Sequence, residues 1–217
     1  MDIQNRMVKF QAQADPAVTI NACLGHFATG NSHTNFYIDV SRVKMRLNEA
    51  REAAKTMCGL IQSGVDVVDT IVCLDGTEVL GACLADKMEK SNIRTVNKHE
   101  TMYIVSPEEN SMHQYIFRDN NRMAIEGKNV LILVDTTSTG STVKRVIECV
   151  RYYGGNIAGI SAIFSVMDKI DGVKVFSLFT ADDIPGYKSF PSHDCPMCAS
   201  HQKIDAMVNG YGYSSLR

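Results

Sequence analysis

Apolar and polar positions alternate along the chain in patterns that predict an α/β domain. Runs of apolar and β-branched residues predict strands at residues 67–74, 101–105, 130–134, 157–166 and 173–179. Apolar residues at helical spacing predict helices at residues 43–61, 79–90 and 143–150. Because strands alternate with helices and residues 130–134 are apolar throughout, we expect a doubly wound, mostly parallel sheet with helices on both faces. Such sheets bind ligands at the carboxyl ends of their strands.

Two stretches do not follow this pattern. Residues 107–128 are polar and interrupted, as in long loops that are mobile and functional. The tail, residues 181–217, carries three of the five prolines and is expected to be an irregular appendage that ends in one short helix. We therefore place the core of the fold in residues 41–180, with an N-terminal segment at 1–40, all within one compact unit.

Composition favours an ordinary globular protein. The 217 residues are 45% hydrophobic, which suits one domain with a sizeable core. A net charge of −2 supplies no basic field for nucleic acid, and no apolar run is long enough to span a membrane. Residues 1–13 lack the apolar stretch of a signal peptide. The cysteine count of seven is odd, which together with apolar surroundings favours reduced core thiols and a cytoplasmic location; the cysteines in apolar stretches are Cys58, Cys73, Cys83 and Cys149.

Residues 130–150 carry the strongest functional signal: a buried strand, the acid Asp135, a run of small hydroxyl residues with Gly140, and a helix. Backbone N–H groups in such a turn close around a phosphate at a helix N-terminus, where the macrodipole favours negative charge. An ordinary helix cap needs one hydroxyl residue, whereas this chain has seven consecutive Thr, Ser and Gly residues. We predict that a phosphate is held by Thr137, Ser138, Thr139, Gly140, Ser141 and Thr142. Asp135 is expected to accept hydrogen bonds from ribose hydroxyls.

This segment resembles the motif with which type I phosphoribosyltransferases bind 5-phosphoribosyl 1-pyrophosphate (PRPP). Residues 133–135 match its apolar positions and first acid, and residues 139–142 match its T-x-G-T-like loop. Thr136 stands in place of the second acid, and Ser141 stands in place of a glycine. Because both acids of the family contact ribose hydroxyls, the resemblance assigns Asp135 and Thr136 to the catalytic site.

The resemblance covers most of the chain and is greatest to orotate phosphoribosyltransferases, which implies a small hood formed by the N-terminal and C-terminal segments. Residues 25–30 and 36–39 are similar to the family's N-terminal hood, residues 75–81 to its pyrophosphate loop, and residues 107–128 take the place of its mobile catalytic loop. The base would then contact the hood at Phe27, Ala28, Thr29, Phe36 and Tyr37. The pyrophosphate would lie against Asp75, Gly76, Thr77 and Glu78, with closing cations from His113, Arg118 and Arg122.

The resemblance implies an enzyme that transfers phosphoribose from PRPP to a base nitrogen, with Mg²⁺ on the pyrophosphate. It also implies a homodimer in which the mobile loop reaches the partner subunit. Ala28 and Leu80 replace family lysines, and residues 165–166 replace the Asp-Arg pair that contacts orotate. Candidate cations for the orotate carboxylate are Arg42, Lys44 and Lys169. The alternative is a PRPP-sensing or nucleotide-sensing regulatory protein that has lost turnover.

Cys195 and Cys198 form a C-x-x-C pair, with His193 and His201 beside them. Two thiolates and two imidazoles suffice for a tetrahedral Zn²⁺ site, although no second C-x-x-C pair accompanies them. A redox pair is one alternative. Another is a structural element like the C-P-x-C that some orotate-like phosphoribosyltransferases carry. The remaining histidines are expected to be surface or hood residues rather than ligands: His26, His33 and His99.

Overall fold

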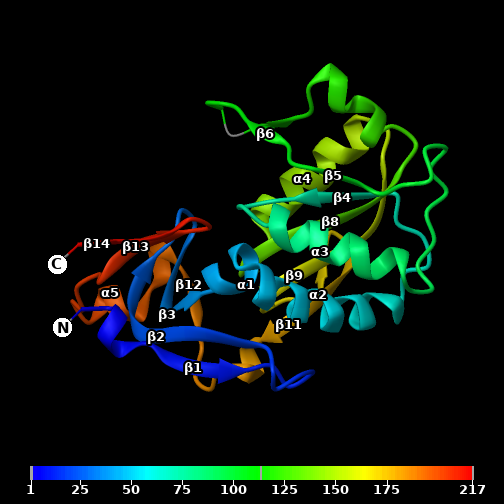
Figure 1. Ribbon diagram of the computed structural model, residues 1–217. Coiled ribbons are helices and arrows are strands. Elements are labelled where there is room, and N and C mark those ends of the chain that lie inside the picture. Colours follow the sequence, from blue (N-terminus) through cyan, green and yellow to red (C-terminus); the bar gives the residue numbers. More distant parts are fainter. Residues whose placement is uncertain (1, 113, 217) are drawn as a thin grey trace.

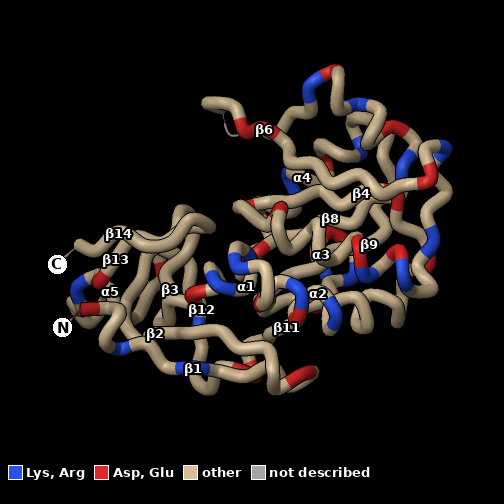
Figure 2. The backbone as a smooth tube through the Cα atoms, in the orientation of Figure 1, with Lys and Arg blue, Asp and Glu red and all other residues tan. Residues whose placement is uncertain are grey.

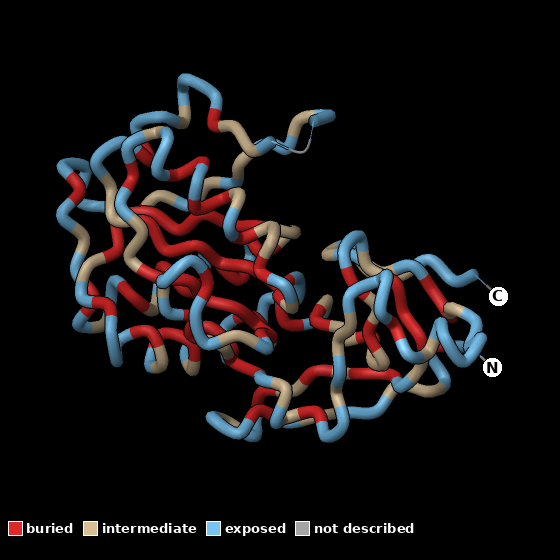
Figure 3. The backbone as a smooth tube through the Cα atoms, turned by 180° about the vertical axis from the view of Figure 1, so that it is seen from behind, coloured by how far each residue is buried: buried red, intermediate tan, exposed pale blue. Residues whose placement is uncertain are grey.

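The computed structural model describes residues 2–112 and 114–216 and shows a core sheet with a smaller hood sheet beside it (Figure 1). Helix α1 (Ser41–Met45) lies between the two sheets. Buried residues concentrate in the strands of both (Figure 3). Acidic and basic residues are interspersed along the chain (Figure 2), in keeping with a net charge of −2.

The core sheet has the order β10–β11–β9–β8–β4–β5, and its pairs are parallel apart from β10 with β11. Its strands are β4 (Thr70–Cys73), β5 (Tyr103–Val105), β8 (Asn129–Thr137), β9 (Asn156–Ser165), β10 (Lys169–Ile170) and β11 (Val173–Thr180). The predicted doubly wound, mostly parallel sheet is confirmed. Among the strands of the core sheet, β4 comes first along the chain, yet it lies inside the sheet, between β5 and β8.

Strand β8 shows why helices cover both faces. Leu131 and Leu133 pack in the cluster that contains α2 (Leu47–Gln62) and α3 (Glu78–Glu89). Ile132 and Val134 pack in the cluster that contains α4 (Ser141–Tyr152). Successive strand residues point to opposite faces. An apolar side chain at every position therefore buries both faces of the strand, which is the pattern seen in the sequence.

The single helix predicted over residues 43–61 is wrong. The chain forms α1 and α2, separated by Arg46, whose backbone is extended with φ −96° and ψ 123°. Leu47, which fits the helical stripe, is 49% exposed, because the break turns it away from the core. The break allows α1 to take its own direction, in which Val43 reaches the core and Lys44 reaches the ends of the core strands.

The hood sheet joins the two ends of the chain. Its order is β12–β3–β2–β13–β14, and β1 pairs with the first residues of β2. Its strands are β1 (Val8–Gln11), β2 (Thr19–Ala28), β3 (Ser32–Asp39), β12 (Ser189–Pro191), β13 (Ala206–Asn209) and β14 (Gly212–Ser215). Phe27, Tyr37 and Ala206 fill its small core. The predicted hood of N-terminal and C-terminal segments is confirmed.

The expectation of an irregular tail is wrong, because residues 181–217 contribute three strands and helix α5 (Pro196–Ala199). The prolines mark element boundaries instead. Pro191 ends the edge strand β12, and Pro196 occupies the first turn of α5, two positions where a missing N–H is tolerated. Short 3-10 turns complete the chain at η1 (Gln4–Arg6), η2 (Asp119–Ala124), η3 (Ala181–Asp183) and η4 (Ser192–Asp194).

The cysteines are free thiols, and the four expected in the core are at most 9% exposed. Burial raises the pKa of Cys73 to about 12 and that of Cys149 to about 11, so these thiols stay protonated at neutral pH. Within the described ranges, none of the helices combines the length and apolar character needed to cross a bilayer.

Candidate functional site

The site is placed by the strand order of the core sheet. From β4 the chain crosses to β5 on one side, whereas β8 leads to β9 on the other side. The carboxyl ends of β4 and β8 therefore flank a topological switch point, where open α/β sheets bind ligands. Asp75 follows β4, and Asp135 lies near the end of β8. Both predicted acids thus lie at the expected edge of the sheet.

Asp135 is 2% exposed and pairs with a buried lysine that the sequence could not place. Lys44 Nζ donates to Asp135 Oδ2 at 3.0 Å, to the Asp75 carbonyl at 2.7 Å, and also to the Gly210 carbonyl. Burial raises the pKa of Asp135 to about 6; Lys44 opposes this shift and the Asp75 carboxylate adds to it. The carboxyl is therefore half ionised near pH 6 and mostly ionised at neutral pH.

Asp75 and Gly76 form a tight turn between β4 and α3, with φ angles of 53° and 77°. The left-handed backbone explains the glycine, because a Cβ at position 76 would meet nothing within 4 Å. Burial raises the pKa of Asp75, with Glu109 and Glu78 adding to the shift and Lys44 opposing it. The Thr77 hydroxyl donates to the Leu74 carbonyl at 2.8 Å, and Glu78 accepts a 2.7 Å hydrogen bond from Ser106.

The tip of the β13–β14 hairpin covers this turn. Gly210 is so close that a Cβ there would lie 2.6 Å from the Asp75 Cβ. Together with the hydrogen bond from Lys44 to the Gly210 carbonyl, this contact ties the hood to the acids of the core.

The predicted phosphate residues form a compact turn from β8 into α4. Gly140 is the N-cap of α4 with φ 71° and ψ 4°, and no side-chain cap closes this end within the described part of the chain. The Ser141 N–H makes a long hydrogen bond of 3.5 Å to Thr139 Oγ1. The N–H groups of the first turn nevertheless point out of the end of the helix, where the helix dipole favours an anion. Thr139 Oγ1 lies 3.2 Å from Ser141 Oγ, which gathers two hydroxyls at the same end. Thr137 is buried, and Thr142 lies in the first turn of α4.

A cavity of about 390 Å³ lies between the phosphate turn and the hood. Ser138 and Thr139 line it from the core, and Lys188 and Phe190 line it from the hood, with Tyr187 beside them. Asn31 Nδ2 donates to Ser141 Oγ at 3.0 Å and so joins the β2–β3 turn to the phosphate turn. Sequence reasoning missed Lys188, because a basic residue in a turn carries no signal of its own.

The predicted hood contacts lie mainly inside the hood. Phe27 and Ala28 are at most 3% exposed, and the Tyr37 ring packs 5.9 Å from that of Phe27. Thr29 closes the β2–β3 turn by donating to the Ser32 carbonyl at 3.0 Å. The Phe36 ring instead stacks on Tyr187, 6.5 Å away, at the edge of the cavity.

The stretch expected to be a mobile loop contains the hairpin of β6 (Glu108–Glu109) and β7 (Tyr115–Ile116), whose tip projects from the body of the protein (Figure 1). The strands of the hairpin contact α4, where Arg145 lies over the Tyr115 ring at 5.4 Å and pairs with Glu109 at 3.5 Å. Arg118 forms a bidentate pair with Glu108, at 2.7 Å for both hydrogen bonds. Arg122 pairs with Glu126 at 3.2 Å. His113, also predicted as a closing cation, lies outside the described residues.

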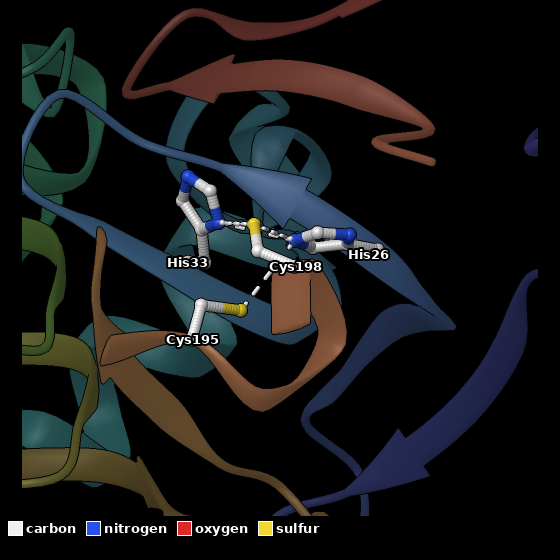
Figure 4. A group of neighbouring side chains, drawn as sticks. All are labelled: His26, His33, Cys195 and Cys198. Carbon is white, nitrogen blue, oxygen red and sulfur yellow. Dashed lines mark hydrogen bonds between the residues drawn. The ribbon is translucent and has the colours of Figure 1, made fainter. Parts of the chain in front are cut away.

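Cys195 and Cys198 lie beside two histidines, but not the two expected. The cluster contains His26 of β2 and His33 of β3, both predicted to be non-ligands, and neither His193 nor His201 is part of it among the described residues (Figure 4). His193 and His201 were predicted because they lie next to the cysteines in the sequence. His26 and His33 are far from the cysteines in the sequence and come close to them only in the folded hood.

No protein-family model matches the chain. The orotate phosphoribosyltransferase of Heliobacterium modesticaldum is 22% identical over 178 residues, covering 80% of this chain and 84% of that protein. Transcriptional regulator GfcR of Methanococcus maripaludis is 28% identical over 151 residues, covering 67% of this chain and 68% of that protein. The crystal structure of adenine phosphoribosyltransferase from Thermoanaerobacter pseudethanolicus has a TM-score of 0.50 at 16% identity, covering 82% of this chain and 97% of that chain.

The fold comparison agrees with the mostly parallel core sheet of this chain. The matched enzymes are phosphoribosyltransferases, which transfer a pentosyl group. This is the enzyme class that the sequence predicted. The chain is thus similar in sequence to orotate phosphoribosyltransferases and has the type I phosphoribosyltransferase fold.

Proposed function

We propose that this protein binds PRPP or a nucleoside 5′-monophosphate and transfers phosphoribose to a pyrimidine base, with orotate as the leading candidate. One observation carries the proposal. The hydroxyl-rich turn at the uncapped N-terminus of α4 lies at the same switch point as Asp135, so that an anion site adjoins a ribose acceptor. The spacing of these groups along one strand and turn suits a ribose 5-phosphate.

In this reaction a base nitrogen displaces pyrophosphate from C1 of the ribose, so the protein mainly positions the reactants and stabilises charge. Residues 137–142 would hold the 5-phosphate, and Asp135 would accept from the ribose hydroxyls. Asp75, Glu78 and Glu109 suit Mg²⁺, which proteins bind through one or two carboxylates together with substrate phosphates. The ion would neutralise charge on the departing pyrophosphate.

The cavity beside the phosphate turn offers a place for the base. The aromatic rings of Tyr187 and Phe190 line it, as expected for a planar ligand, and Lys188 adds a cation at its hood side. Hydrogen bonds between Asn35 and the Lys188 backbone, at 2.7 and 3.1 Å, fix the position of that residue. We therefore propose Lys188 as the partner of the orotate carboxylate, in place of the cations considered from sequence.

The deciding experiment measures pyrophosphate release from PRPP with Mg²⁺ and a panel of orotate, uracil, adenine, guanine and hypoxanthine. We expect release with a pyrimidine, and with orotate above uracil. Release with purines alone would overturn the pyrimidine assignment. Absence of release with every base, while nucleoside monophosphates still bind in calorimetry, would replace the enzyme by the regulatory alternative.

Lys188→Ala tests the base pocket. Loss of a charge-assisted hydrogen bond, worth roughly 1.5–3 kcal/mol, should raise KM for orotate by at least about tenfold. KM for uracil, which has no carboxylate, should change little. Lys55→Ala removes an exposed lysine from the outer face of α2 and serves as the matched control. An equal rise in KM for orotate and uracil would show that Lys188 does not bind the orotate carboxylate.

The alternative is a nucleotide-sensing regulator, and three observations favour it. Lys44 already pairs with Asp135, Thr136 replaces the second acid, and a transcriptional regulator is among the relatives. The ion pair with Lys44 still allows Asp135 to bind a ribose hydroxyl, but it weakens Asp135 as a hydrogen-bond acceptor during catalysis. We retain the enzyme as the first proposal because the matched enzymes cover more of this chain.

We also propose a homodimer in which the β6–β7 hairpin lies against the partner subunit. The strands of the hairpin lie on α4, but its tip projects from the body of the protein (Figure 1), and Met112 near this tip is 72% exposed. Light scattering should give twice the chain mass, and a chain mass in solution would contradict the proposal.

A further inference from the structure

The geometry points to a structural zinc site formed by His26, His33, Cys195 and Cys198, which we propose as a property of this protein independent of its activity. The four side chains converge on one point inside the hood (Figure 4). His26 comes from β2 and His33 from the neighbouring strand β3, whereas Cys195 immediately precedes α5 and Cys198 lies within it. Their four ligand atoms all lie within 4.8 Å of one another.

The distances fit a tetrahedral site. Zinc bonds of about 2.3 Å to sulfur and about 2.0–2.1 Å to nitrogen place the corners of a tetrahedron about 3.3–3.8 Å apart. His26 Nε2 lies 3.6 Å from Cys195 Sγ and 3.7 Å from Cys198 Sγ. His33 Nδ1 lies 3.2 Å from Cys198 Sγ and 3.0 Å from His26 Nε2. These four edges need changes of only a few tenths of an ångström to hold the ion.

The residues around His26 orient its ring as in known metal sites, where the non-ligating ring nitrogen donates to a neighbouring acceptor. His26 Nδ1 lies 2.8 Å from the Gln202 carbonyl, so this nitrogen carries the proton and Nε2 presents its lone pair to the cluster. The His26 backbone N–H donates to Asp205 Oδ2 at 2.9 Å, and the Asp205 N–H donates to the His26 carbonyl at 2.7 Å. A bulge in the β2–β3 register between Leu24 and Phe27 turns His26 inward.

Two thiolates and two imidazoles favour zinc over harder ions. Carboxylate and carbonyl oxygens are the ligands that Mg²⁺ and Ca²⁺ prefer, whereas tetrahedral S₂N₂ sets select zinc. A redox pair would need only the two cysteines and leaves the convergence of two imidazoles unexplained. All four corners of the tetrahedron are protein ligands, which makes the site structural rather than catalytic.

The ion would clamp the C-terminal segment to the first hairpin of the hood. Downstream of the cysteines, β13 pairs with β2 and leads to Gly210, which contacts Asp75 and Lys44. Upstream of His33, Asn31 reaches the phosphate turn. One site thus supports the two hood–core contacts that lie beside the candidate site.

The first test is metal content. Full-length protein purified without chelator should carry one zinc per chain by mass spectrometry of its metals. Cobalt in place of zinc should give visible bands of a tetrahedral ion and near-ultraviolet bands of thiolate ligation. Removing zinc with a chelator should lower the melting temperature and expose residues 195–205 to hydrogen exchange. Iron or copper at the site, or no bound metal with no cobalt spectrum, would overturn the proposal.

Variants identify the ligands. Since losing a second-shell partner alone weakens metal binding by about 10–100-fold, His33→Ala and Cys198→Ser should lower zinc affinity by more than about a hundredfold. His193→Ala and His201→Ala remove histidines next to the cysteines that are outside the cluster, and they should keep the metal. Cys198 lies at the surface, so its serine variant should fold, which circular dichroism checks. Loss of zinc in the His193 and His201 variants, with retention in the other two, would assign the metal elsewhere.

Discussion

At the scale of single residues, the protonation state of Asp135 affects both the stability of the fold and the binding of ribose. Its buried carboxyl has a pKa raised to about 6, although Lys44 Nζ lies 3.0 Å away, because desolvation outweighs the attraction. The unfolded chain releases this proton near pH 4. Between about pH 4 and 6 the folded state therefore binds more protons than the unfolded state, and this group's contribution to stability falls as pH rises through that window.

The same titration should appear in ribose binding. Ionised Asp135 accepts hydroxyl hydrogen bonds more strongly than the neutral acid, by roughly 1 kcal/mol or about fivefold in affinity. The ratio of affinities for UMP and 2′,3′-dideoxy-UMP should rise by that factor from pH 5 to pH 7.5. Both ligands carry the same phosphate, so its own ionisation near pH 6 cancels in the ratio. Asp135→Asn should give a flat ratio, and a flat ratio in the unaltered protein would remove Asp135 from the ribose site.

At the scale of elements, the phosphate turn depends on the backbone of Gly140. A residue with a side chain in the left-handed region costs roughly 1–2 kcal/mol. A Cβ at Gly140 would also lie 3.2 Å from three side-chain carbons of Ile170. Gly140→Ala should therefore shift the N–H groups of the turn and weaken UMP binding by about tenfold in calorimetry.

Gly59→Ala is the matched control for this change. Gly59 lies within α2, and a Cβ there meets nothing within 4 Å. Alanine in a helix is favoured over glycine by roughly 0.5–1 kcal/mol, so this variant should be slightly more stable and bind UMP normally. If Gly140→Ala also binds normally, the turn does not hold the phosphate.

The sequence predicted what is local and missed what the fold assembles. The strand, acid, hydroxyl run and helix around Gly140 are consecutive, so their pattern was readable. Lys44 meets Asp135 across 91 residues, and His26 meets Cys195 across 169, so no spacing rule connects them. The break at Arg46 could not be predicted for a related reason, because the helical periodicity of the apolar residues continues through it.

At the scale of the whole molecule, the hood packs against α2 through β2 and also meets the core at two bridges over the site. Lys44 joins three pieces: Asp135 of the core sheet, the Asp75 turn, and Gly210 at the tip of the β13–β14 hairpin. Asn31 and Ser141 form the second bridge. A ligand between these bridges would be enclosed by both sheets, so the position of the hood affects binding as directly as the phosphate turn does.

Lys44→Met tests this link. It leaves a buried carboxylate without its counter-charge, which costs about 3–5 kcal/mol. For a chain of this length each kcal/mol lowers the melting temperature by roughly 2–4 °C, so calorimetry should show a fall of roughly 10 °C. Hydrogen exchange should rise at residues 206–215 more than elsewhere in the hood.

In the double variant Lys44→Met with Asp135→Leu, an apolar pair replaces the ions, and most of the lost stability should return. Arg46→Met is the control, since its side chain is 60% exposed and its 3.0 Å pair with Glu49 contributes about 0–1 kcal/mol. Equal effects of Lys44→Met and Arg46→Met would mean that Lys44 does not hold the hood to the core.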